Sequence, residues 1–238
     1  MTSPMIPSIP SDSVGWINTE QMIEIDRIMI EDLHILLIQM MENAGRNLAR
    51  VAIETASPAT AVVYAGSGGN GGGGLVCARH LHNAGVAVEV VLSADPEAMT
   101  EIPAHQLDIV RRMGIPVFGA DSGVRSADVA VDAMVGYSLK GELNGVAATL
   151  AEGLREVSGS IVSLDAPTGL NTTTGRADGP VVNADATMTL CLPKVGLRGS
   201  PHIGDLYLAD ISVPASVTED VSGFTAPPFG LGRVLKLA

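Results

Sequence analysis

Seven of the nine residues from Gly66 to Gly74 are glycine, and Ser67 and Asn70 carry the only side chains in this run. The apolar segment 61–65 precedes it, and residues 74–84 follow with the spacing of a helix. Glycine has no Cβ and lets another group approach the backbone closely, while the start of a helix offers unpaired N–H groups to a phosphate. The run therefore predicts a strand-to-helix connection that lies against a ligand.

The first six residues of the run, from Gly66 to Gly71, fit the spacing G-x-G-x-x-G of dinucleotide-binding proteins. The glycines continue beyond the point where that fingerprint ends. The acidic residue that would bind a ribose could only be Asp95, which lies farther along the chain than the fingerprint places it. The spacing is a weak signal by itself, and a flexible glycine-rich turn is the alternative. Asn70 is unusual here, because an amide oxygen among glycines is a good partner for a hard cation or for a hydroxyl group of a ligand.

Segments typical of strands and of helices alternate along most of the chain. Strands are expected at 61–65, 86–92, 116–119, 129–134, 161–167, 186–193 and 206–213. Helices are expected from Glu20, after caps at Asn18 and Thr19, and at 33–52, 74–84, 97–113 and 145–157. The early strands are apolar on both faces, as in parallel strands covered by helices. This order predicts an α/β fold, a three-layer αβα sandwich with a Rossmann-like, mostly parallel sheet.

The composition fits one large domain with an aliphatic core. Apolar residues make up 46% of the 238 residues and aromatic residues only 3%, so alanine, valine, leucine and isoleucine must do most of the packing. We expect residues 1–17, which are rich in proline and serine, to form a flexible N-terminal arm. The domain is expected over 18–214, and residues 215–238 are expected to form a loop-rich C-terminal tail.

The net charge of −12 argues against a protein that binds nucleic acid or an anionic membrane surface. No apolar stretch reaches the length of a transmembrane helix, and the N-terminal residues lack the features of a signal peptide. Cys77 and Cys191 are far apart and form no C-x-x-C pair, which is typical of small core residues in a reducing compartment. We therefore expect a cytoplasmic protein.

Two apolar strands end in a carboxylate, and both lead into loops with unusual chemistry. Asp132 lies at the end of the strand at 129–134, and Asp165 is followed by a turn that presents Thr168. A carboxylate in such a place is costly unless it is paired or binds a metal, although capping of the next helix is the commoner explanation for one aspartate alone. With Asn70 these side chains make an oxygen-rich set suited to a hard cation, and no histidine or cysteine group has zinc spacing.

Six segments occur together in one order: MENAGRNLA, the glycine run continuing into GLVCARHL, VDAMVG, SLDAPTGLNTTTG, LPKVGL and GDLYLADISVP. In this combination the chain resembles the NAD(P)HX epimerase family, the YjeF N-terminal-domain proteins, over residues 18–214. The resemblance implies a Rossmann-type homodimer that interconverts the R and S forms of NADHX and NADPHX, the hydrated forms of the reduced nicotinamide cofactors. A separate NAD(P)HX dehydratase would act in the same pathway, because this chain leaves no room for a fused one.

The resemblance also assigns roles to single residues. It implies that Asn70, Asp132 and Thr168 bind a potassium ion and that Asp165 is the catalytic acid/base. Two loops, together with Asp165, would hold the substrate: Gly69, Asn70, Gly71, Gly72 and Gly73 in the first, and Gly136, Tyr137, Ser138, Leu139, Lys140, Gly141 and Glu142 in the second. Independently of the resemblance, residues 18–56 are too apolar to be a mere arm, so we expect the N-terminal helices to form the dimer interface.

The chain departs from the family pattern in both loops. The usual first loop reads G-P-G-N-N-G-G-D-G, and Gly69 and Gly73 stand here in place of its first asparagine and its aspartate. The usual G-x-G of the second loop reads Gly136-Tyr137-Ser138. The alternative function is therefore a catalytically degenerate or re-purposed member that binds a nucleotide-like ligand or, as a scaffold, a protein partner. An NAD-dependent dehydrogenase ranks last, because no histidine/arginine pair for hydride transfer is recognisable.

Overall fold

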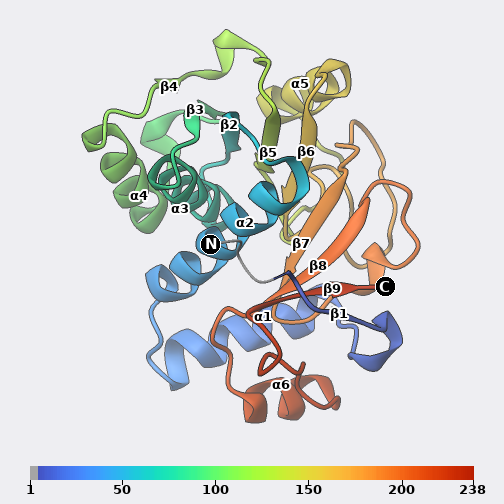
Figure 1. Ribbon diagram of the computed structural model, residues 1–238. Coiled ribbons are helices and arrows are strands. Elements are labelled where there is room, and N and C mark those ends of the chain that lie inside the picture. Colours follow the sequence, from blue (N-terminus) through green and yellow to red (C-terminus); the bar gives the residue numbers. More distant parts are fainter. Residues whose placement is uncertain (1–4) are drawn as a thin grey trace.

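The computed structural model describes residues 5–238, and within them nine strands form a single sheet in the order β1-β9-β8-β7-β6-β5-β2-β3-β4 (Figure 1). The strands are β1 (Ser8–Ile9), β2 (Thr60–Ala65), β3 (Ala87–Leu92), β4 (Val117–Phe118), β5 (Val129–Ala133), β6 (Ser160–Leu164), β7 (Ala186–Leu190), β8 (Asp205–Ala209) and β9 (Val234–Leu237). Neighbouring strands are parallel except β8 and β9. The predicted mostly parallel sheet is confirmed.

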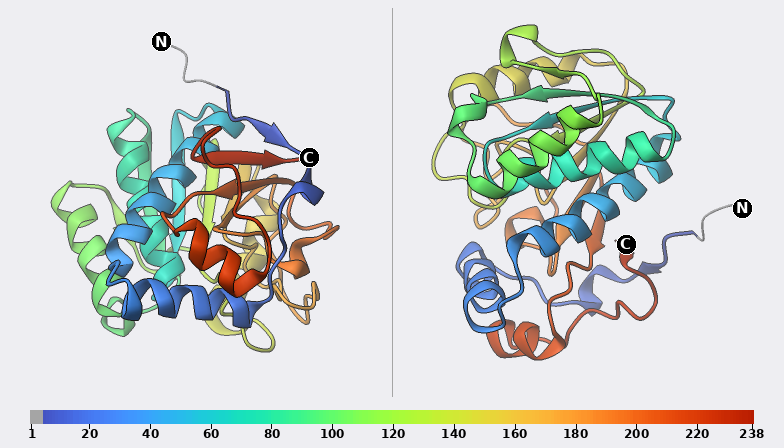
Figure 2. Two further views of the ribbon diagram at one scale, coloured as in Figure 1. Left: turned by 90° about the horizontal axis from the view of Figure 1, so that it is seen from below. Right: turned by 90° about the vertical axis from the view of Figure 1, so that its left-hand side faces the viewer.

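Helices cover both faces of this sheet, which confirms the αβα sandwich (Figure 2). They are α1 (Thr19–Arg27), α2 (Leu37–Ala56), α3 (Gly69–Asn83), α4 (Glu101–Arg112), α5 (Gly145–Gly153) and α6 (Ala215–Ser222). Helices α2, α3 and α4 pack on one face, where Leu48, Leu75 and Leu107 join the largest core cluster. Helix α5 packs on the other face through Leu150. Helices α1 and α6 lie side by side beyond the carboxyl end of the sheet (Figure 1).

Short helical turns complete the structure. A π-helical segment, Ile28–Asp32, continues α1, and five 3₁₀ turns occupy Ser11–Ser13, Pro96–Ala98, Ala120–Ser122, Leu154–Glu156 and Val195–Leu197. The predicted cap of α1 is confirmed: Asn18 Oδ1 accepts from Gln21 N at 2.9 Å, and Gln21 Oε1 accepts from Asn18 N at 3.1 Å. In the described part of the chain no helix combines the length and apolar character needed to cross a membrane.

The glycine run differs from the prediction, because most of it is helix rather than loop. Helix α3 begins at Gly69, five residues before the expected start, and four consecutive glycines form its first turns. A Cβ on Gly72 would lie 2.5 Å from Met41 Sδ on α2, and a Cβ on Gly74 would lie 2.5 Å from Ala133 Cβ on β5. The absence of side chains therefore lets α3 rest directly on α2 and on the sheet, in addition to any contact with a ligand.

The parallel strands β2 and β5 are adjacent in the sheet, with Ala65 opposite Ala133, and the order in which successive strands are added to the sheet reverses between them. From β2 the chain proceeds outward through β3 to β4, and from β5 it proceeds the other way through β6, β7 and β8. In open α/β sheets, ligands bind at such a switch point, at the carboxyl ends of the strands. The two predicted substrate loops follow β2 and β5, so both lie at this point.

The two terminal segments are more ordered than expected. The predicted arm at 1–17 contains β1, which pairs with β9, and Ile17 is fully buried beside Lys194. The predicted tail at 215–238 contains α6 and β9, and β9 extends the sheet beyond β8. Because the pairing partners of these strands are far away in the sequence, the local pattern gave no sign of them. The part of the expected arm at 1–4 lies outside the described residues.

The close packing of α3 predicts unequal effects for two glycines of the run. A Cβ on Gly71 would overlap the carbonyl oxygen of Gly66, whereas a Cβ on Gly68 would meet no atom within 4 Å. We expect Gly71→Ala to lower the free energy of unfolding by roughly 1–3 kcal/mol or more, despite alanine's higher helix propensity. Gly68→Ala is the matched control, with an expected change within about 0.5 kcal/mol. Urea denaturation of both variants measures the difference, and equal values would contradict the packing argument.

Candidate active site

A cavity of about 410 Å³ lies at the carboxyl ends of the strands, between the glycine-rich start of α3 and helices α1 and α2. One wall is apolar and comes mainly from these two helices, with Met22, Ile30, Leu37, Met40, Met41 and Ala44. The polar wall contains Asp26, Asn70, Tyr137, Asp165 and Lys194. A cavity that is largely apolar, with a few polar groups converging on it, is typical of a site for a small organic ligand.

Asp165 follows β6 directly and is 1% exposed. Its φ is +64°, and Ala166 N donates to the carbonyl oxygen of Leu164 at 2.8 Å, which closes a tight turn centred on Asp165. The neighbouring strand β7 ends in the same way at Cys191, with a φ of +63°. Backbone in this region costs a non-glycine residue about 1–3 kcal/mol and is concentrated at functional sites. The turn directs the Asp165 carboxylate toward the cavity rather than along the strand.

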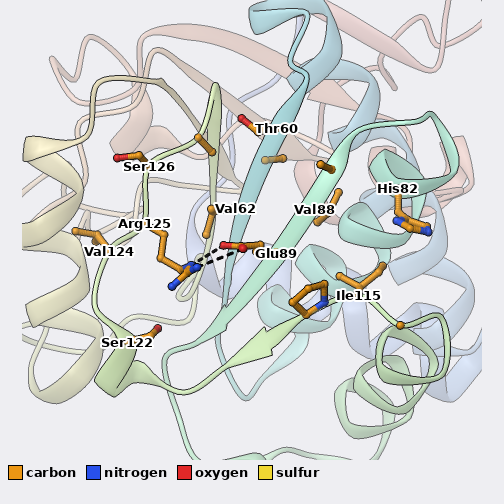
Figure 3. Close-up of a pocket in the computed structure, with 15 residues that line it drawn as sticks. Thr60, Val62, His82, Val88, Glu89, Ile115, Ser122, Val124, Arg125 and Ser126 are labelled. Carbon is orange, nitrogen blue, oxygen red and sulfur yellow. Dashed lines mark hydrogen bonds and ion pairs between the residues drawn. The ribbon is translucent and has the colours of Figure 1, made fainter.

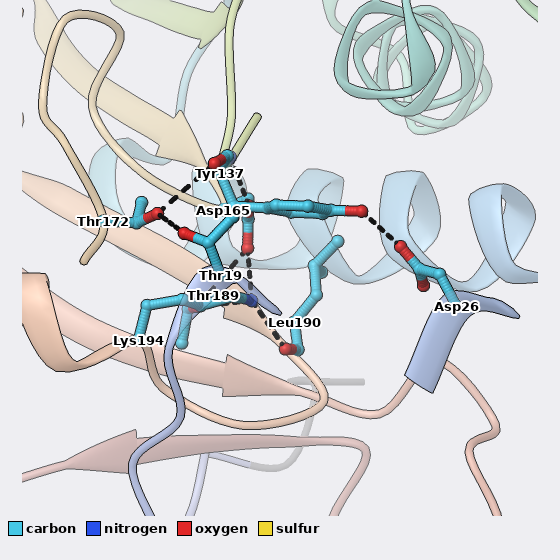
Figure 4. Close-up of polar contacts among 8 residues, drawn as sticks. All are labelled: Thr19, Asp26, Tyr137, Asp165, Thr172, Thr189, Leu190 and Lys194. Atoms are coloured by element: carbon cyan, nitrogen blue, oxygen red, sulfur yellow. Dashed lines mark hydrogen bonds and ion pairs between the residues drawn. The ribbon is translucent and has the colours of Figure 1, made fainter. Parts of the chain in front are cut away.

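Lys194, which sequence reasoning did not place in the site, is the counter-ion of Asp165. Its ammonium is fully buried and donates to Asp165 Oδ1 at 2.6 Å, to the carbonyl oxygen of Leu190 at 2.9 Å and to Thr189 Oγ1 at 3.2 Å (Figure 4). The other oxygen, Asp165 Oδ2, accepts from Tyr137 N at 2.9 Å. All three donors of the ammonium are thus used. The signal that could have indicated it is a lysine directly after the expected strand at 186–193, in LPKVGL.

Asp132 and Thr168, predicted to share a cation, are bonded directly to each other. Thr168 Oγ1 donates to Asp132 Oδ1 at 2.6 Å, and Asp132 Oδ2 accepts from Thr168 N and from Ser163 Oγ, both at 2.8 Å. Thr168 Oγ1 in turn accepts from Val135 N at 3.0 Å. Burial raises the pKa of Asp132, and the hydrogen bonds from Thr168 and Ser163 oppose the rise. None of the ion pairs within residues 5–238 includes this carboxylate.

The side chain of Asn70 lies next to Gly136 in the second loop and is not hydrogen-bonded to Asp132 within residues 5–238. Its Oδ1 is 2.8 Å from the position that a Cβ on Gly136 would take, so a larger residue at 136 would displace it. Its Nδ2 is buried and has no hydrogen-bond partner in the part of the chain that the structure describes. Among the hydrogen bonds of residues 5–238, none links Asn70 to Asp132 or Thr168. A buried amide without a partner is rare and indicates that a further group belongs next to it.

The predicted substrate-binding residues divide into two groups. Those that line the cavity are Gly69, Asn70, Gly73, Gly136, Tyr137, Ser138 and Asp165. Those that do not line it are Gly71, Gly72, Leu139, Lys140, Gly141 and Glu142. Residues 139–142 form the outer part of the second loop, and of these Lys140, Gly141 and Glu142 are exposed. Asp26 on α1 lines the cavity and was not predicted, because nothing in its helical surroundings separates it from a surface residue.

A larger cleft of about 660 Å³ lies at the opposite end of the strands (Figure 3). It contains Thr60, the first residue of β2, and the ion pair of Arg125 with Glu89, whose Nε and Oε2 are 2.5 Å apart. The Arg125 guanidinium also stacks 4.1 Å from the ring centre of Phe118. None of the predicted site residues lines this cleft, so its size alone does not make it the functional site.

The burial of Lys194 predicts a large loss of stability on its removal. Lys194→Met leaves the Asp165 carboxylate buried without its counter-ion, and we expect the free energy of unfolding to fall by about 3–5 kcal/mol. Lys236→Met is the matched control, because Lys236 Nζ also lies 2.6 Å from a carboxylate, that of Asp205, but at the surface. Its expected loss is at most about 1 kcal/mol. Denaturant unfolding compares the two, and a small loss for Lys194→Met would contradict the role of the pair.

Comparisons with known proteins identify the family of the chain. Residues 37–196 match the family described as YjeF-related protein N-terminus. An NAD(P)H-hydrate epimerase of Dehalogenimonas lykanthroporepellens is 39% identical over 82% of this chain and 80% of its own length. A bifunctional NAD(P)H-hydrate repair enzyme Nnr of Thermofilum pendens is 37% identical, and the match spans 37% of that longer protein. The crystal structure of yeast ynu0, YNL200c, superposes with a TM-score of 0.80 and 26% identity, over 93% of this chain and 99% of its own. The chain belongs to the family of YjeF-related N-terminal domains.

Proposed function

We propose that this chain is an NAD(P)H-hydrate epimerase, an isomerase that interconverts the R and S forms of hydrated NADH and NADPH. Three relatives with this name, of similar length, are 32–39% identical to it and match 79–84% of the chain. The observation that carries the proposal is the buried Asp165–Lys194 pair on the polar wall of a largely apolar cavity, beside the switch point of the sheet. This arrangement also distinguishes the epimerase from a scaffold, which has no need of a buried charge pair facing a cavity.

Epimerisation at C6 of the hydrated nicotinamide ring breaks the C6–O bond and re-forms it on the opposite face. The ring nitrogen's lone pair expels the hydroxyl, which leaves with a proton as water, and an iminium cation remains. Water then adds from the other side and gives its proton back. No proton is gained or lost overall, so the site needs one group that alternately donates and accepts it.

Asp165 is suited to this task because its carboxylate lies on the cavity wall beside a proton donor. Lys194 Nζ is 2.6 Å from Asp165 Oδ1, so a proton can pass from the ammonium through the carboxyl group to the departing hydroxyl and return when water adds. The negative charge also stabilises the iminium cation within an apolar cavity. Dinucleotides bind across the switch point in this fold class, so the first N–H groups of α3, at Gly69, are the groups that would hold a phosphate of the substrate.

A monovalent cation, potassium, completes the proposed site. Asp132, Thr168 and Asn70 would hold it, because their donor set consists of carboxylate, hydroxyl and amide oxygens, which suit a hard cation. One observation supports the fit: the Asp132 carboxylate is fully buried, and none of the ion pairs within residues 5–238 includes it. When bound, the ion would supply a fixed positive charge close to the ligand.

A homodimer is also part of the proposal, as are a cytoplasmic location and a separate dehydratase in the same pathway. Helices α1 and α2 and their connection expose large apolar residues: Ile23, Ile30, Leu33, Leu36 and Ile53. Exposed apolar side chains concentrated on one pair of helices are typical of an interface.

The proposed cytoplasmic location agrees with the state of the two cysteines, which are free and buried as expected in a reducing compartment. The bifunctional relatives carry a name that covers NAD(P)H-hydrate repair as a whole.

Conversion of R-NADHX to S-NADHX tests the proposed function. We expect the wild type to be active and Asp165→Asn to lose at least about 100-fold in kcat, because general acid–base groups contribute roughly 10²–10⁴-fold. Asp121→Asn, at an exposed position outside the cavity, is the control and should retain full activity. A wild-type chain that converts neither epimer contradicts the assignment.

Thermal unfolding in potassium chloride and in choline chloride at equal ionic strength tests the cation. A bound ion stabilises the folded state, so the Tm of the wild type should be higher in potassium. Asp132→Asn and Asn70→Ala should lose this increment. Asp128→Asn, at the other end of β5, is the control and should keep it, because Asp128 is an exposed residue that binds Thr60 N at 2.8 Å. An increment of the same size in all four proteins would contradict the site.

Light scattering measures the oligomeric state. The wild type should be a dimer at micromolar concentration, and Leu36→Glu should dissociate it by placing a charge in the apolar interface. Val146→Glu on α5 introduces the same charge at another exposed apolar position, so it should leave the dimer intact. A monomeric wild type would contradict the proposed assembly.

A further inference from the structure

Tyr137 spans the cavity and is held at each end by a carboxylate (Figure 4). At its backbone, Tyr137 N donates to Asp165 Oδ2 at 2.9 Å, and its carbonyl oxygen accepts from Thr172 Oγ1 at 3.4 Å. At the far end of the side chain, the hydroxyl donates to Asp26 Oδ2 at 2.5 Å. The Lys194 ammonium lies 5.9 Å from the centre of the ring. The ring is therefore fixed between the proposed reacting carboxylate and helix α1.

The contact with Asp26 decides which part of the hydroxyl is left for a ligand. A phenol has one proton to donate and lone pairs that accept. Burial and the neighbouring Asp26 raise the pKa of Tyr137 well above its ordinary value, so the phenol keeps its proton. That proton is committed to Asp26, and among the hydrogen bonds of residues 5–238 none is donated to Tyr137 Oη. Because both side chains line the cavity, a ligand there meets the hydroxyl as an acceptor.

The positions of the two substituents on the substrate ring fit this arrangement. In the hydrated nicotinamide ring the reacting carbon, C6, and the carbon that bears the carboxamide, C3, occupy opposite corners. A ring whose C6 hydroxyl lies at Asp165 directs its carboxamide away from Asp165, along the cavity. Tyr137 runs in the same direction, from its amide at Asp165 to its hydroxyl at Asp26. The carboxamide N–H is a donor, and the hydroxyl oxygen at that end is an acceptor.

We propose that Tyr137 determines specificity for the carboxamide of the substrate, by accepting a hydrogen bond from its N–H group, and that Asp26 is the positioning residue that orients the Tyr137 hydroxyl for this contact. The inference rests on the proposed epimerase function and adds the recognition of the ring's second substituent. It also gives the tyrosine a function at the middle position of the sequence Gly136-Tyr137-Ser138.

The test compares two substrates that differ only in this donor: hydrated NADH and the hydrated form of reduced 3-acetylpyridine adenine dinucleotide, in which a methyl group replaces the amide nitrogen. A site that binds an N–H group discriminates against an analogue without it. For one hydrogen bond we expect the wild type to prefer the carboxamide about tenfold in kcat/KM. Tyr137→Phe and Asp26→Ala should abolish the preference, mainly by raising KM for the carboxamide substrate. If Tyr137 and Asp26 had only a structural role, their substitution would lower kcat/KM equally for both substrates.

Three further variants separate the roles. Asp26→Asn retains an acceptor for the hydroxyl and should keep most of the preference, whereas equal losses for Asp26→Asn and Asp26→Ala would show that the charge itself acts. The double variant Asp26→Ala/Tyr137→Phe should be no worse than Tyr137→Phe, because Asp26 acts through Tyr137. Glu20→Gln removes an exposed carboxylate from the same helix and should change neither substrate.

The outcomes also separate this inference from the proposed function. An active wild type without preference for the carboxamide, or a preference that Tyr137→Phe leaves unchanged, overturns the inference and leaves the epimerase assignment in place. Multiplying effects in the double variant overturn the positioning role of Asp26. A wild type that is inactive on both substrates overturns the proposed function, and the inference with it.

Discussion

The ion pair of Lys194 with Asp165 ties together the parts of the structure that form the cavity. Asp165 follows β6 and Lys194 follows β7, and the ammonium also binds the last carbonyl group of β7. Both charges are removed from water, a costly arrangement unless each is fully compensated. Here the lysine uses all its donors, and the carboxylate accepts at both oxygens. The strained turn at Asp165 is maintained by these contacts, so the position of the reacting group depends on the pair.

The glycine run serves packing as well as ligand binding. Helix α3 lies so close to α2 and to the sheet that no room remains for side chains at Gly72 and Gly74, and the backbone of Gly66 leaves none at Gly71. This close approach brings the start of α3, with Asn70, next to Gly136 in the second loop. The two loops at the switch point thus depend on the same absence of side chains. Gly68 and Gly69 meet no such neighbours, and the glycines of the run that line the cavity are Gly69 and Gly73.

The N-terminal helices give the cavity its apolar wall and its second carboxylate. Asp26 comes from α1 and Asn70 from the first turn of α3, while Tyr137, Asp165 and Lys194 come from loops that follow strands. Burial raises the pKa of Asp26, which its hydrogen bond from Tyr137 opposes. A segment that the sequence suggests mainly as an interface is therefore part of the site. If α1 and α2 also form the dimer contact, assembly and the shape of the cavity are linked through the same two helices.

Sequence alone was sufficient for the parts of this protein that depend on local pattern. The alternating apolar segments predicted the αβα sandwich, because strand and helix periods are written into neighbouring residues. The strand-end positions of Asp132 and Asp165 were also predictable, since parallel strands bring their carboxyl ends to one edge. The ordered motifs further indicated the family.

Contacts between distant segments were decided only by the tertiary structure. Lys194 and Asp26 are unremarkable in their local surroundings, and each becomes part of the site through a partner at least 29 residues away. The pairing of β1 with β9 joins the two ends of the described chain, which no local signal predicts. Whether a glycine is needed depends on the atom that its Cβ would meet, and that atom belongs to another element. Side-chain chemistry is set by the sequence, but which charges face each other is set by the fold.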